Sequence, residues 1–107
     1  MPATRGAWER HQPAPVLVED LASLRGPVSG VVRLPRHLEW SERREYDLGV
    51  EGDVIWLYSR VIREASSEQD LQEHLDLGTL LRLWPDLRLP DRHRRAWEAA
   101  FAELHGR

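Results

Sequence analysis

The spacing of apolar residues along the chain changes near residue 48. Upstream, apolar residues come in short β-branched stretches separated by glycine and proline, which is typical of strands and extended segments. Val28–Leu34 is the clearest of them, and Pro35 is expected to end it or to place it at a sheet edge. A hairpin-like turn is expected near Ser41–Arg44. Residues 16–48 are therefore predicted to form an extended or short β arm, which must lie on the helices or on another protein because an isolated hairpin is marginally stable.

Downstream of residue 48 the apolar period becomes helical. Apolar residues at i, i+3 and i+4 spacing predict a helix that begins near a capping Asp47 or Asp53 and runs to about Ala65. Trp56 lies off the centre of this stripe, towards one edge. The stripe itself consists of Val54, Leu57, Tyr58, Val61, Ile62 and Ala65.

Shorter helices are predicted after this one. Ser67–Asp70 resembles a capping box, with Asp in place of the usual Glu or Gln, and begins a helix that Gly78 is expected to break or bend. A further short helix must stop before Pro85. Pro90 suits the first turn of a last helix, and Gly106 stands where a C-cap glycine belongs.

These patterns predict a mainly α protein with one small domain over residues 16–107. Its helical part, three to four short helices, occupies residues 49–107 and follows the extended or β arm. A chain of 107 residues has room for one domain at most. Residues 1–15 carry three prolines and scattered charges, which predict a flexible tail. Trp8, within this tail, is interpreted as a residue that rests on the domain or as an anchor for a partner.

Candidate chemistry is scarce. The chain has no cysteine, which excludes disulfides, thiolate metal sites and a cysteine nucleophile. The five histidines lack a metal-binding spacing such as HExxH, the serines lack a GxSxG context, and the glycine-rich stretch Gly26–Gly30 lacks the lysine of a P-loop. The sequence therefore predicts no catalytic residue, no metal site and no cofactor, in a protein that is not an enzyme.

Composition and charge bear on location and partners. No apolar run approaches the ~20 residues that a membrane helix needs, and the N-terminus lacks the apolar region of a signal peptide. We therefore expect a cytoplasmic protein. A net charge of −3 is not that of a general polyanion binder. All fifteen basic residues are arginine, which pairs with carboxylates and stacks on aromatic rings, so the composition suits protein interfaces.

The stretch Leu77–Phe101 holds Trp84 and Trp97, two prolines and the densest run of arginines. We interpret it as two helices that meet at a fixed corner, with both tryptophans facing inward. Residues 68–84 also have roughly helix-turn-helix proportions, which leaves DNA binding open as an alternative. The second helix of that unit is short, leucine-rich and carries one arginine before Pro85, whereas a recognition helix needs several polar residues on its outer face.

The arginine run at the start of the last predicted helix has two interpretations. In the first it is a solvated helix face, in which Arg95 pairs with Glu98. In the second it contacts an acidic partner or nucleic acid, because positive charge at a helix N-terminus is electrostatically awkward without one. The run consists of Arg88, Arg92, His93, Arg94 and Arg95.

Motifs distributed over residues 16–104 resemble a group of small, mostly actinobacterial proteins. Members of that group are encoded beside AbiEii-class nucleotidyltransferase toxins and are taken to be their antitoxins, and some carry the general description of transcriptional regulator. The motifs are structural and not catalytic. They include Gly26-Pro27, Leu34-Pro35, Leu38-Glu-Trp40-Ser41, Tyr46-Asp47-Leu48, Leu57-Tyr58, Val61-Ile62-Arg63-Glu64, Asp70-Leu71, Leu83-Trp84-Pro85-Asp86-Leu87, Leu89-Pro90 and Arg94-Arg95-Ala96-Trp97.

The resemblance implies an antitoxin that neutralises a nucleotidyltransferase-type toxin by stoichiometric protein–protein contact. Residues Val28–Leu48 would lie along the toxin, with an edge strand as one mode of addition. Tryptophan and arginine are enriched at interface hot spots. On these grounds four residues are the predicted partner-binding residues, while the partner's identity, the stoichiometry and the oligomeric state stay open. They are Trp40, Trp56, Arg92 and Arg95.

Overall fold

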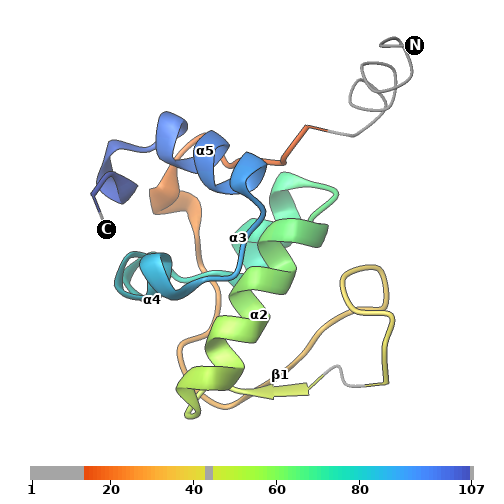
Figure 1. The fold of residues 1–107 in the computed structure, drawn as a ribbon. Coiled ribbons are helices and arrows are strands. Elements are labelled where there is room, and N and C mark those ends of the chain that lie inside the picture. The colour runs from red at the N-terminus through yellow and green to blue at the C-terminus, as the bar shows by residue number, and fades with distance from the viewer. Residues whose placement is uncertain (1–13, 43–44, 107) are drawn as a thin grey trace, which may run out of the picture.

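A computed structural model describes residues 14–42 and 45–106 of the chain (Figure 1). Trp8 and residues 1–13 of the predicted tail lie outside the described residues. Helices fill the C-terminal half and a two-stranded sheet precedes them, which confirms the predicted mainly α fold. In chain order the elements are η1 (Leu21–Ser23), β1 (Val31–Arg33), β2 (Glu45–Asp47), α2 (Glu51–Glu64), α3 (Glu68–His74), α4 (Leu77–Leu83), η2 (Trp84–Asp86), α5 (Asp91–Ala100) and η3 (Ala102–Leu104).

The longest helix, α2, buries the apolar stripe that its sequence predicts and ends at Glu64, one residue from the expected end. Its start differs from the prediction. The residue at the N-cap is Val50, which has no capping side chain, and Asp53 instead accepts a hydrogen bond from the backbone N–H of Asp47 at 3.0 Å. Neither Asp47 nor Asp53 is therefore the cap, because the chain turns into the helix between them and the Asp53 carboxylate holds that turn.

The two short helices α3 and α4 each begin at a side-chain cap. Ser67 Oγ accepts a hydrogen bond from the N–H of Asp70, so the serine half of the predicted capping box is present. The Asp70 carboxylate accepts from the N–H and hydroxyl of Ser66, where a capping box would have the N–H of Ser67 as its donor. Asp76 accepts from the N–H of Thr79 at 3.0 Å and starts α4. The expectation that Gly78 breaks the helix is wrong, because Gly78 lies inside α4. The break falls between Leu75, the C-cap of α3, and Asp76, the N-cap of α4. The Asp76 side chain accepts a hydrogen bond from the first turn of α4 and so begins a new helix there.

The corner between α4 and α5 closes on two buried tryptophans, as predicted. Trp84 and Trp97 are fully buried, and their ring centroids lie 6.1 Å apart. The helix α4 ends at Leu83, before Pro85, and continues as the 3-10 turn η2. Pro90 is the N-cap of α5, and Gly106 follows the last turn with a φ of 76°, a left-handed conformation that favours glycine.

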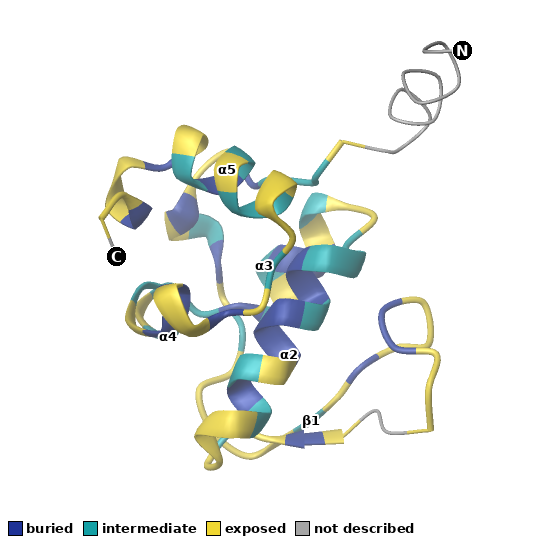
Figure 2. Cartoon of the chain, in the orientation of Figure 1, coloured by how far each residue is buried: buried dark blue, intermediate teal, exposed yellow. Residues whose placement is uncertain are grey.

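The arm over residues 16–48 lies on the protein's own helices. β1 and β2 pair antiparallel with Val32 opposite Tyr46, so the strand in the predicted Val28–Leu34 stretch is shorter than that stretch. Two residues of the predicted turn, 43 and 44, lie outside the described residues. Leu34 and Leu38, in the connection between the strands, are almost fully buried in the same core as the helices. Figure 2 shows the loop between the two strands as mostly exposed, with short buried stretches in dark blue.

The segment before the sheet packs along α3. The N–H of Arg25 donates to the carbonyl of Gln72 at 2.9 Å, and the N–H of Gly26 donates to the carbonyl of Leu75 at 2.8 Å. Val18, Leu21 and Leu24 are buried beside them. One hydrophobic core therefore joins the N-terminal segment, the hairpin and the helices, and it leaves the outer face of α2 to the solvent.

Candidate functional site: an exposed tryptophan–arginine surface

The large apolar side chains that the described residues leave exposed are concentrated between residues 28 and 56, in the hairpin region and the first half of α2. Isolated exposed apolar residues are ordinary, whereas a concentration of them marks an interaction surface. The side chains are Val28, Val31, Trp40, Val50 and Trp56.

Two of these residues, Trp40 and Trp56, lie near one arginine, Arg60. Trp40 is 61% exposed and Trp56 is 49% exposed. The guanidinium carbon of Arg60 lies 4.9 Å from the ring centroid of Trp40, within the range of a cation–π contact. Trp56 is four residues before Arg60 on α2, so the two side chains neighbour each other on the helix surface. Trp40, Trp56 and Arg60 together form what we call the aromatic surface.

A buried carboxylate fixes this surface from below. Glu39 is 2% exposed, and its Oε1 lies 3.0 Å from Nε of Arg60. Tyr46 and Ser41 each donate a hydroxyl hydrogen bond of 2.7 Å to the Glu39 carboxylate. Arg60 is also 3.7 Å from the carboxylate of Glu64, one turn further along α2. The loop before β2, the strand β2 and α2 are thus tied together at one anion, and Trp40 follows directly in the chain.

The surroundings of Glu39 hold its pKa below the ordinary value for a glutamate. Burial alone would raise the pKa, but hydrogen bonds from Tyr46 and Ser41 and the positive charge of Arg60 stabilise the anion more. The folded protein therefore binds a proton at this site less readily than the unfolded chain does. The stability that Glu39 contributes is fully present above its unfolded pKa, about 4.3, and is lost as the pH falls through the lower folded value.

Glu39→Gln is expected to destabilise the protein by about 2 kcal/mol at neutral pH, because an amide cannot satisfy Arg60 and accept both hydroxyl bonds as an anion does. The deficit should shrink as the pH falls below about 4.3, where the wild-type protein loses its own contribution. Urea unfolding of the wild-type and Glu39→Gln proteins at a series of pH values measures this difference in the free energy of unfolding. Glu45→Gln, on an exposed β2 residue whose ion pair with Arg33 spans 3.4 Å, is the control. A deficit that does not change with pH would contradict the assignment.

The predicted residues Arg92 and Arg95 lie on α5, three residues apart on its exposed side, and not on the aromatic surface. The prediction that Arg95 pairs with Glu98 is wrong. Arg95 instead reaches Asp91 at 4.0 Å, and both of these side chains are highly exposed, so the pair contributes little. Glu98 instead lies at the corner between α4 and α5, where its carboxylate accepts a 2.9 Å hydrogen bond from Nε1 of Trp84.

The arginine run divides into structural and exposed members. Arg94 belongs to the corner: its guanidinium donates to the carbonyls of Trp84 and Leu87 at 3.2 and 2.6 Å and lies 5.0 Å from the Trp84 ring. Arg88 and Arg95 are exposed to solvent. The interpretation of the whole run as one solvated face or one contact therefore fails, because every third or fourth residue of α5 turns towards the core.

The α3–α4 unit gives little material for reading DNA. On α4, Gly78 and Arg82 are the exposed residues, and Arg82 is 2.8 Å from the carboxylate of Glu51. A recognition helix presents several polar side chains to base edges. The remaining face of α4 packs into the core through Leu80 and Leu83.

Other kinds of site are not apparent in the part of the chain that the structure describes. Within residues 14–42 and 45–106, no group of three or more histidine, aspartate or glutamate side chains is placed to hold a metal ion. No described helix has both the length and the apolar character needed to cross a bilayer. His37 Nε2 lies 2.9 Å from the Asp70 carboxylate, and this contact fixes the 34–38 loop to α3.

In comparisons with known proteins, no family model, curated protein or solved structure matches the chain.

Sequence reasoning found the two exposed tryptophans but missed Arg60 and Glu39, which connect and fix them. The spacing of Trp56 and Arg60 on one helix face is a signal that the sequence offers. No local signal marks Glu39, because a glutamate between Leu38 and Trp40 is buried only when the loop folds against α2.

Proposed function

We propose that the protein is the antitoxin of a toxin–antitoxin pair and neutralises a nucleotidyltransferase-type toxin by stoichiometric contact. The observation that carries the proposal is the aromatic surface: two solvent-exposed tryptophans, of which Trp40 contacts Arg60 and Trp56 precedes it by one helical turn, with Arg60 paired to a buried carboxylate. Fixing these side chains before binding lowers the entropy cost of ordering them in a complex. The resemblance described from the sequence supplies the kind of partner.

In this proposal the aromatic surface is the centre of the interface. The exposed valines Val28, Val31 and Val50 extend the apolar contact around the hairpin. The outer edge of β1, whose partner strand among the described residues is β2 alone, offers backbone groups to a strand of the toxin. Arg92 and Arg95 act at the rim, where they meet acidic residues near the toxin's metal- and nucleotide-binding cleft. The antitoxin blocks this cleft and performs no catalysis of its own, in the cytoplasm.

Trp40→Ala and Trp56→Ala are each expected to weaken the complex by about 2 kcal/mol, roughly thirtyfold in Kd, because a buried aromatic anchor contributes this much at an interface centre. The measurement is calorimetric titration of the purified protein with the product of the adjacent gene. Arg88→Ala, at an exposed position away from the aromatic surface, is the control and should bind as the wild type does. Circular dichroism of each variant checks that the fold is kept.

Absence of any complex with the adjacent gene product would overturn the proposal, and so would tryptophan variants that bind as tightly as the wild type. The double substitution Arg92→Gln and Arg95→Gln should lower the association rate and make that rate less dependent on salt. It should change the dissociation rate less, as expected for charges at the rim of an interface. Equal effects on both rates would place the two arginines at the centre of the interface instead.

The DNA-binding alternative predicts specific operator binding, as a dimer that matches two half-sites. A gel-shift experiment with the protein's own promoter, with and without the adjacent gene product, separates the two functions. The antitoxin proposal expects at most weak and salt-sensitive DNA binding by the protein alone.

A further inference from the structure

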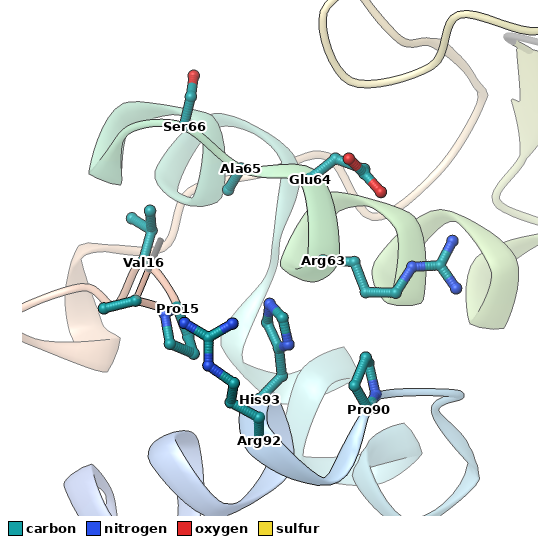
Figure 3. A pocket seen from close by; sticks show the side chains of 10 residues that line it. Pro15, Val16, Arg63, Glu64, Ala65, Ser66, Pro90, Arg92 and His93 are labelled. Carbon is teal, nitrogen blue, oxygen red and sulfur yellow. The ribbon is translucent and has the colours of Figure 1, made fainter. Parts of the chain in front are cut away.

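A second surface feature lies at the C-terminal end of α2, outside the aromatic surface. A pocket of about 660 Å³ opens where the end of α2 and the start of α5 meet the N-terminal segment (Figure 3). That volume is within the usual range for small-molecule sites. Its apolar wall is formed by Pro15, Val16, Ala65 and Pro90.

The polar side of the pocket is mostly cationic. Arg63 from α2 and Arg92 and His93 from α5 line it, with Glu64 as the one acidic side chain. The Glu64 carboxylate lies 3.7 Å from Arg60, the arginine that also pairs with Glu39. Among the residues that the structure describes, no carboxylate lies within ion-pair distance of Arg63. Arg63 therefore offers the pocket a guanidinium that has no carboxylate partner among the described residues, beside an apolar wall.

His93 provides a second, independent observation. Its Nδ1 is shielded from solvent and makes no hydrogen bond with any of the described residues. A buried polar atom without a partner is costly and is rare in folded proteins. Burial, followed by the positive charges of Arg92 and Arg63, lowers the pKa of His93, and Glu64 opposes this shift. These are the charged groups that face His93 from its own helix and from α2, and together they disfavour the protonated imidazole, whereas an anion in the pocket would favour it.

We propose that this pocket binds a carboxylate that is joined to an apolar group, as at the C-terminal residue of a peptide. The apolar group would lie against Pro15, Val16 and Ala65, and the carboxylate would pair with Arg63 and accept a hydrogen bond from His93. Arginine binds carboxylates through two parallel N–H groups. The mostly apolar wall favours such a ligand over a phosphate, which needs a shell of hydrogen-bond donors around it.

The test uses the full-length protein and three probes: N-acetyl-leucine, its neutral amide N-acetyl-leucinamide, and inorganic phosphate. The imidazole resonances of His93 are followed by NMR. N-acetyl-leucine is expected to shift them, to raise the apparent pKa of His93, and to bind more tightly as the pH falls from about 8 to about 5. The amide should bind at least about tenfold more weakly, because it lacks the charge. Phosphate should give smaller shifts than N-acetyl-leucine.

Arg63→Gln is expected to weaken the binding of N-acetyl-leucine by about tenfold. Arg88→Gln removes the same charge from an exposed position outside the pocket and should leave the binding unchanged. The comparison of acid and amide on the wild-type protein needs no variant, so it decides the matter even if Arg63→Gln folds poorly. Equal binding of acid and amide, stronger binding of phosphate, or no shift of His93 with any probe would each overturn the proposal. Arg92 lines the pocket and is also a rim residue in the antitoxin proposal, but that proposal is tested separately, by the effect of Trp40→Ala and Trp56→Ala on the complex with the adjacent gene product.

Discussion

Replacing Trp84 with alanine is expected to lower the free energy of unfolding by about 3–5 kcal/mol, the range for large aromatic residues truncated in a core. Trp84 is fully buried and touches three partners that close the corner between α4 and α5. Its ring lies 6.1 Å from that of Trp97, its Nε1 donates a 2.9 Å hydrogen bond to Glu98, and the Arg94 guanidinium lies over its face. Truncation leaves a cavity and also leaves Glu98 and Arg94 without this neighbour.

The matched control for this prediction is Trp56→Ala, the same substitution at a half-exposed site on α2. It should cost at most about 1 kcal/mol in stability while it weakens the complex proposed above. Guanidinium chloride unfolding of both variants measures the difference. Trp84→Phe, which keeps most of the ring and loses the hydrogen bond, should fall between them and keeps the comparison possible if Trp84→Ala does not fold. Equal losses for Trp84→Ala and Trp56→Ala would contradict the role assigned to the corner.

Gly26→Ala is expected to destabilise the protein by about 2–3 kcal/mol, because the added methyl group would meet backbone that cannot move aside. A Cβ at Gly26 would lie 2.5 Å from the carbonyl carbon of His74 and 2.6 Å from the nitrogen of Leu75. These contacts belong to the same stretch in which the N–H of Gly26 donates to the Leu75 carbonyl at 2.8 Å. Relief of the clash would break that bond and lift the N-terminal segment from α3.

Gly52→Ala serves as the opposite control. A Cβ at Gly52 has open space around it, and the residue lies in the first turn of α2. Alanine should therefore stabilise the protein by about 0.5–1 kcal/mol through its higher helix propensity. Thermal unfolding of the two variants should move in opposite directions. A Gly26→Ala protein as stable as the wild type would show that the segment before the sheet is held loosely against α3.

The helices were largely predictable because their determinants are local. The apolar stripe of α2, the serine cap at Ser67 and the two prolines around the corner each act within one or two helical turns, so their signal stands in adjacent sequence. The errors at the helix ends have one cause. Asp53 and Gly78 both carry strong local propensities that neighbouring residues override. Asp53 bonds to the turn before α2, and Asp76 caps α4 two residues before Gly78.

The candidate site could be predicted only in part. The exposure of Trp56 follows from its position off the apolar stripe, which the sequence displays. The position of Trp40 does not follow from local sequence, because it depends on how the 34–42 loop returns to α2. The separation of Arg94 from Arg92 and Arg95 was equally hidden within a single run of like residues, and only the packing of α5 on the corner divides them.

The sequence by itself determined the mainly α composition, the tryptophan corner and the absence of any recognised catalytic motif, because these depend on residue type and local spacing. The tertiary structure alone decided that the N-terminal arm belongs to the core and that Glu39 and Arg60 meet beneath Trp40. It also brought Arg63 and His93 to one pocket. The physical reason is that a buried ion pair between distant segments depends on the whole path of the chain, and no period or cap in the sequence encodes that path.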